Sequence, residues 1–146
     1  MAVDIIRSPE SIAISDSTVS QEVGLCYFDP DTEALIELNA ISNPYISVEP
    51  FRAAIRKMYL VISPHQTLSY IKIQPSLPML ERENFGIKII INHSEPSAAD
   101  FTSLPEFNRY RVDSPAAGGF IPLWIYVESK IPATGVLSLT MDVEFE

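Results

Sequence analysis

The stretch Val136 to Glu146 reads VLSLTMDVEFE, and its side chains alternate between apolar and polar along its length. In an extended chain one side carries Leu137, Leu139, Met141, Val143 and Phe145, and the other carries Ser138, Thr140, Asp142, Glu144 and Glu146. Alternation with a period of two is typical of a β-strand with one buried and one solvated face. We therefore expect this end of the sequence to be a strand of the core.

Similar short apolar segments precede this strand, and prolines separate them. The 12 prolines are spread along the chain, against 5 glycines, and proline interrupts strands and helices because it has no backbone N–H. We expect strands at Val3–Ile6, Ser11–Ile14, Val19–Phe28, Glu33–Leu38, Tyr45–Val48, Tyr59–Ser63, Leu68–Gln74, Gly86–Asn92, Phe120–Glu128 and Val136–Phe145. This pattern predicts an all-β antiparallel sandwich or barrel, formed by residues 1–146 as a single domain.

Helical signals are few. In Val48–Met58, Pro50 suits the first turn of a helix, and Phe51, Ile55 and Met58 lie on one helical face. We expect a short helix or turn that leads into the strand at Tyr59, although the same residues can instead extend that strand. A second helical turn or a long loop is expected within residues 97–108. The fold thus contains at most one or two short helices.

The balance of charge excludes some classes of partner. The net charge is -9, and phosphate contacts need lysine and arginine, so direct binding to nucleic acid or to a membrane surface is not expected. The first residues lack the basic start and apolar core of a signal peptide, and no apolar run reaches the ~20 residues of a membrane helix.

The charge is also unevenly distributed. Up to residue 50, Arg7 is the only base against nine acids, which are Asp4, Glu10, Asp16, Glu22, Asp29, Asp31, Glu33, Glu37 and Glu49. The middle of the chain is mildly basic, with Arg52, Arg56, Lys57, Lys72, Arg82 and Lys88 against Glu81 and Glu83. We expect these opposite charges to complement one another on a mixed surface or between subunits.

No motif of catalysis, of phosphate binding or of cofactor binding is present. The single cysteine, Cys26, lies in an apolar run and is expected to be a small buried hydrophobe. His65 and His93 are expected in loops. The acidic turn Asp29, Asp31 and Glu33 is either a solvated hairpin tip or a cation site completed by a second subunit. We therefore expect a protein that is not an enzyme and has no cofactor.

Trp124 and Tyr126 lie on the strand face opposite Leu123, Ile125 and Val127. If the aliphatic face is the core, the two aromatic side chains either form a second buried layer or make a contact surface.

The segment from Ile131 to Phe145, a turn with glycine followed by an alternating strand that closes on Asp-Val-Glu-Phe, resembles the last strand of the single jelly-roll coat proteins of small RNA viruses. The run from Phe51 to Pro64 is similar to the strand that ends at a proline in that fold. The resemblance implies an antiparallel β-sandwich of the jelly-roll type. An immunoglobulin-like sandwich shares the strand pattern, so the order of the strands stays open.

Three classes of function follow from these expectations: a viral structural or movement protein, a binding module and an enzyme. The first is a structural subunit, resembling a viral capsid protein, that assembles with itself or with another capsid protein in a virion or the host cytoplasm. Its interface candidates are Val3, Ile5 and Ile6, as a strand added to a neighbouring sheet edge, together with Trp124, Tyr126, Arg52, Arg56 and Lys57. The alternatives are a β-sandwich that binds a peptide, glycan or protein through Trp124 and Tyr126, or a jelly-roll viral movement protein. A hydrolase or isomerase that uses His65 or His93 is the third.

Overall fold

The computed structural model describes residues 19, 22–29, 31–38, 45–77, 79–91, 94–132, 135–138 and 140–146. The expected strands Val3–Ile6 and Ser11–Ile14, and with them the interface candidates Val3, Ile5 and Ile6, lie outside these residues. Within them the chain forms the strands β1 (Val23–Asp29), β2 (Ala34–Leu38), β3 (Tyr45–Val48), β4 (Ala53–Ile62), β5 (Tyr70–Ser76), β6 (Phe85–Ile91), β7 (Tyr110–Asp113), β8 (Phe120–Ser129), β9 (Gly135–Ser138) and β10 (Thr140–Phe145), and the short helices α1 (Met79–Arg82) and α2 (Ala98–Thr102).

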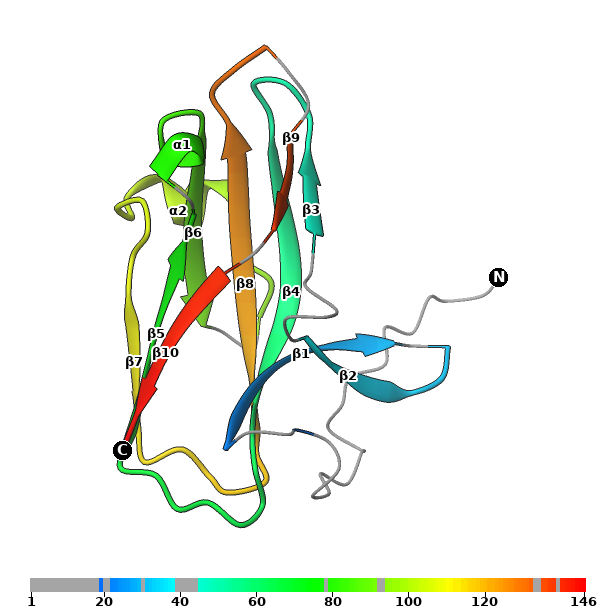
Figure 1. Ribbon diagram of the computed structural model, residues 1–146, viewed down its shortest axis with the longest axis vertical. Helices are drawn as coiled ribbons and strands as arrows, with labels where there is room; N and C mark the ends of the chain where they lie inside the picture. The colour runs from blue at the N-terminus through cyan, green and yellow to red at the C-terminus, as the bar shows by residue number, and fades with distance from the viewer. Residues whose placement is uncertain are drawn as a thin grey trace.

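The strands pair in antiparallel fashion and form two packed layers (Figure 1). One layer is a five-stranded sheet in the order β2-β1-β4-β8-β6, and the other contains a three-stranded sheet in the order β10-β5-β7. A further pair, β3-β9, lies beside them. The expected all-β antiparallel sandwich is confirmed.

The core lies between the layers and consists of aliphatic side chains at alternate positions of the facing strands. Its fully buried members include Leu60 and Ile62 of β4, Ile71 and Ile73 of β5, Ile87 and Ile89 of β6, and Leu123, Ile125 and Val127 of β8. The alternation of apolar and polar residues in the sequence therefore corresponds to the inner and outer faces of the two sheets.

Two prolines sit inside strands where one neighbouring strand is absent. Pro75 of β5 faces Met141 of β10, whereas the pairing of β5 with β7 ends at Ile73. Pro122 of β8 faces Tyr59 of β4, whereas the pairing of β8 with β6 begins only at Leu123. A residue without a backbone N–H is tolerated at such half-paired positions.

The expected helix at Val48–Met58 is wrong from Ala53 onward, because the chain there is strand β4, paired with β8 from Ala53 to Val61. The apolar spacing that fits a helical face also fits a strand, and the long pairing with β8 decides between them. Pro50 and Phe51 form the turn before β4, and Phe51 adopts a positive φ of 53°. The helical turn expected within residues 97–108 is confirmed as α2, and α1 was not anticipated.

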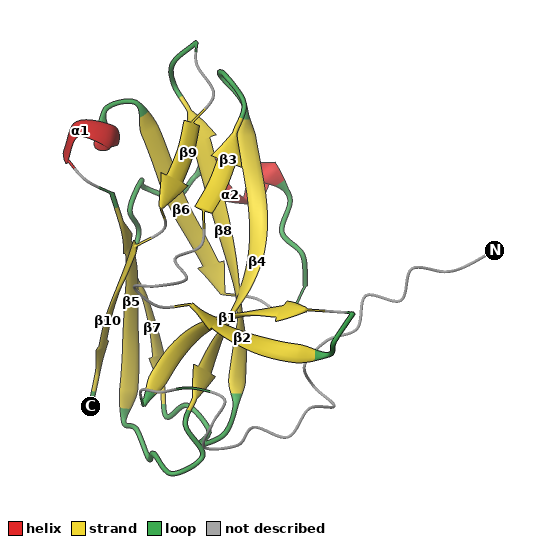
Figure 2. Ribbon diagram, turned by 45° about the vertical axis from the view of Figure 1, so that its right-hand side comes forward, coloured by secondary structure: helices red, strands yellow, loops and turns green. Residues whose placement is uncertain are grey.

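The hairpin β1–β2 projects from one side of the sandwich (Figures 1 and 2). β1 pairs with β4 as part of the five-stranded sheet, and on the outer face of that sheet Cys26, Tyr59 and Val61 form a second, smaller apolar cluster with Val19. The hairpin was expected from the sequence, and its pairing of Leu25 with Leu38 through Asp29 with Ala34 confirms it.

Candidate functional site

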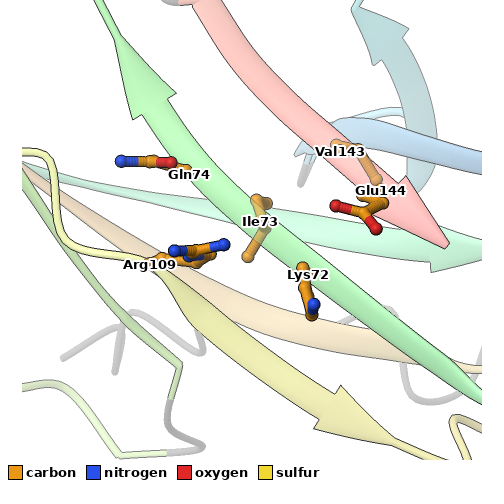
Figure 3. A pocket seen from close by; sticks show the side chains of 6 residues that line it. All are labelled: Lys72, Ile73, Gln74, Arg109, Val143 and Glu144. Atoms are coloured by element: carbon orange, nitrogen blue, oxygen red, sulfur yellow. The ribbon is translucent and has the colours of Figure 1, made fainter.

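The outer face of the three-stranded sheet is hollowed along β5. One hollow, of about 110 Å³, is lined by Lys72, Ile73, Gln74, Arg109, Val143 and Glu144 (Figure 3). An adjoining hollow, of about 200 Å³, is lined by Gln74, Pro75, Ser76, Arg82 and Phe107. Because both share Gln74, we treat them as one surface and call it the β5 groove.

The groove exists because the chain before β7 leaves β5 and crosses to the other sheet. The Phe107 N–H donates to the Ile87 carbonyl at 2.7 Å. The buried Asn108 amide accepts a hydrogen bond from the Ile89 N–H and donates one to the Ile89 carbonyl, both at 2.8 Å. Gln74 and the residues after it therefore have no β7 neighbour, and the space beside them stays open.

The β5 groove carries three cations. Arg109 is exposed, and the Lys72 ammonium lies 5.2 Å from the centre of the Tyr70 ring. The Arg82 guanidinium lies 5.6 Å from the centre of the Phe107 ring, and its Nε donates a hydrogen bond to the Leu77 carbonyl. Within the described parts of the chain, none of the three forms an ion pair. Glu144 lines the same hollow as Lys72 and Arg109, so the wall that β10 forms there is acidic.

Next to the groove, Tyr70 organises a small polar network. The Arg111 guanidinium lies 4.5 Å from the centre of the Tyr70 ring, and the Tyr70 hydroxyl donates to the Glu144 carboxylate at 3.2 Å. Partial desolvation and this carboxylate raise the pKa of Tyr70. The Asp113 carboxylate, 2.7 Å from Arg111 Nε, raises the pKa of Arg111. Both shifts favour the protonated forms of these groups.

Trp124 and Tyr126 belong to a second covered layer on the outer face of the five-stranded sheet. Trp124 is 8% exposed, and the Lys57 ammonium lies 5.2 Å from its ring centre and 5.1 Å from that of Tyr59. Tyr126 is half-buried and stacks on the fully buried Phe101 of α2, with ring centres 5.0 Å apart. Of the two alternatives for these aromatic residues, a second buried layer or a contact surface, the structure shows the buried layer.

The acidic turn is closed by a local hydrogen bond. The Asp29 carboxylate accepts a hydrogen bond from the Asp31 N–H at 2.9 Å, and Glu33 has a positive φ of 56°. Asp29 is thus engaged in closing the turn. Among the residues that the structure describes, no three histidine, cysteine or acidic side chains of the single chain are placed to hold a metal ion, and the alternative of a cation site at Asp29, Asp31 and Glu33 completed by a second subunit stays a prediction.

The candidate nucleophile and the one described histidine lie in different surroundings. Cys26 is fully buried, as expected, and burial raises the pKa of its thiol to about 12. His65 is exposed in the loop after β4, and His93 lies outside the described residues. The thiol is neutral near pH 7, which removes it as a nucleophile.

One end of the sandwich exposes large apolar side chains that sequence reasoning did not single out. Phe51, in the β3–β4 turn, is 66% exposed, and Met79, in α1, is 82% exposed. Figure 1 places both elements at the same end of the molecule. Arg52 and Arg56 are exposed near Phe51, and Lys57 is partly covered. Phe51 was read as part of a helical face, and only its positive φ distinguishes it.

Comparisons with family models, with curated proteins and with solved structures find no match to the chain. None of the helices in the described segments has the length and apolar character needed to cross a membrane.

Proposed function

We propose that the protein is a non-catalytic structural subunit of the viral capsid type, which assembles with copies of itself. The observation that carries this proposal is Phe51. A large aromatic side chain that is 66% exposed has an unfavourable environment, and a positive φ adds about 1–3 kcal/mol of backbone strain for a residue other than glycine. Both costs are offset when a neighbouring subunit buries the side chain.

Met79 strengthens the argument. It is 82% exposed, and Figure 1 places its helix α1 at the same end of the molecule as the β3–β4 turn that carries Phe51. Exposed apolar side chains gathered at one end of a molecule are typical of a contact surface between proteins.

The strand pairing supports a jelly-roll topology for this subunit. The pairs β3 with β9, β4 with β8, and β5 with β7 are nested, as in one long antiparallel hairpin. The additional pairs β10 with β5 and β6 with β8 form where such a hairpin rolls into two sheets. On this reading α2 and the loop around it take the place of one strand, and β1–β2 is an addition at the edge.

The alternative of a binding module that uses Trp124 and Tyr126 has less support. Lys57 and α2 cover these side chains within the same chain, so they do not form an open aromatic platform. The fold alone does not separate the two functions.

The test is the mass of the particle in solution, measured by light scattering over a range of protein concentrations. We expect a mass that rises to a closed oligomer. Phe51→Gly should reduce self-association while the monomer stays folded, because glycine adopts a positive φ without strain.

The matched control is Ser114→Gly, which also replaces an exposed residue of positive φ, 48°, with glycine but removes no aromatic side chain, and it should leave self-association unchanged. A wild-type protein that stays monomeric at every concentration would overturn the proposal.

A further inference from the structure

We propose that the β5 groove receives the acidic tip of the β1–β2 hairpin from a second copy of the chain. This inference rests on the proposed self-assembly and names the surfaces that meet. The tip consists of Asp29, Asp31 and Glu33, which the structure places at the end of a projecting hairpin.

The first argument is charge. The chain has a net charge of -9, yet Lys72, Arg82 and Arg109 gather along one groove without ion-pair partners in the described structure. The hairpin tip gathers three of the acids of the N-terminal part of the chain, and Asp31 and Glu33 are exposed. Opposite potentials on two surfaces of one protein favour their contact over contacts between like surfaces.

The second argument is position. Figures 1 and 2 both show the hairpin on the opposite side of the sandwich from β5, β7 and β10. The tip cannot reach the groove of its own chain without unpairing β1 from β4, which are joined from Val23–Ile62 to Cys26–Tyr59. A contact between two different surfaces is heterologous, and repetition of such a contact closes into a ring or extends as a filament.

The third argument is size. The groove consists of two hollows, of about 110 Å³ and 200 Å³, that adjoin at Gln74 along β5 and do not form one enclosed cavity. Spaces of this size, open along a strand, suit a few side chains of a protein loop. Phe107, on the floor of the second hollow, has a positive φ of 57°, and its carbonyl accepts a hydrogen bond from Gln74 Nε2 at 2.9 Å, so the groove is held open by a fixed loop.

The groove also specifies an orientation. Glu144 repels a carboxylate on the β10 wall, so the tip must lie toward Arg109 and Arg82 and away from β10. We expect Asp31 or Glu33 to pair with Arg109, whose guanidinium forms a two-pronged contact with a carboxylate.

The experiment reverses one charge on each surface of the full chain. Asp31→Lys and Arg109→Glu should each weaken self-association about tenfold at low salt, because an attraction between exposed groups becomes a repulsion. A mixture of the two variants, or a chain that carries both changes, should restore assembly, since each reversed surface then finds its complement. Glu95→Lys is the matched control for Asp31→Lys, because it changes an exposed carboxylate outside the hairpin tip by the same charge.

The outcomes separate the two proposals. If the wild type assembles but Asp31→Lys weakens it no more than Glu95→Lys does, or if the mixture restores nothing, the tip does not bind the groove and the proposed function stands. If the wild type is a monomer at every protein and salt concentration, the proposed function fails and this inference fails with it.

Discussion

Asn108→Leu should destabilise the protein by about 2–4 kcal/mol, because the Asn108 side chain closes the edge of β6. Asn108 is 8% exposed, and its amide makes two hydrogen bonds of 2.8 Å with the backbone of Ile89. Leucine has a similar size but leaves the Ile89 N–H and carbonyl without partners. Each buried unpaired group costs about 1–3 kcal/mol, and the added apolar burial offsets part of the sum.

The assay is unfolding in urea, monitored by far-UV circular dichroism. If the free energy of unfolding falls by about 2 kcal/mol for each molar increase in urea, the loss of stability should lower the urea midpoint by about 1–2 M. The dependence on urea concentration itself should stay unchanged. Asn84→Leu is the matched control, because Asn84 is half-buried and only its backbone carbonyl is engaged, by the Lys130 N–H at 2.8 Å. The control should change the free energy of unfolding by less than about 0.5 kcal/mol. Equal shifts for both variants would refute the claim that Asn108 seals the sheet edge.

Three further outcomes are expected. Gly24→Ala should lower the free energy of unfolding by about 1–3 kcal/mol, because a Cβ there lies 2.5 Å from Val19 Cγ1; an unchanged urea midpoint would contradict the close packing. Phe101→Ala should lower the free energy of unfolding by about 3–5 kcal/mol, because α2 loses its anchor on Tyr126. The fluorescence emission of Trp124, the only tryptophan, should then shift to longer wavelength, and an unshifted spectrum would show that α2 does not shield Trp124. The Cys26 thiol should react with a maleimide at pH 8 only as fast as the protein unfolds, and fast labelling of the folded protein would refute its burial. The free energy of unfolding should fall as the pH rises from 9 toward 12, because the pKa of the thiol is near 9.0 in the unfolded chain and about 12 in the folded one.

The strands could be predicted because their residues alternate, as in Leu123, Ile125 and Val127 against Trp124 and Tyr126. Local pattern also predicted the β1–β2 hairpin, whose partners are close in sequence. It did not distinguish a helix from a strand at Ile55 and Met58, because that choice depends on pairing with β8, which is distant in sequence.

The β5 groove could not be predicted for the same reason. Lys72, Arg82 and Arg109 are spread over the middle of the chain, and only the crossing of Phe107 and Asn108 to β6 brings them beside one space. The exposure of Phe51 depends on its positive φ, which the neighbouring residues in the sequence do not predict. The sequence left open whether Trp124 and Tyr126 form a contact surface or a buried layer, and Lys57, over Trp124, and Phe101 of α2, over Tyr126, decide for the buried layer.

The nested pairing has a consequence for how the protein is made. Tyr45 of β3 pairs with Ser138 of β9, and Ile71 of β5 pairs with Phe145 of β10, so the outermost pairs join residues that are roughly 75–90 positions apart. Closure of loops this long precedes most of the stabilising contacts, which slows folding. On the ribosome, β3 and one edge of β5 must wait unpaired until β9 and β10 have left the exit tunnel. The chain is therefore most exposed to aggregation and to chaperones while it is being synthesised.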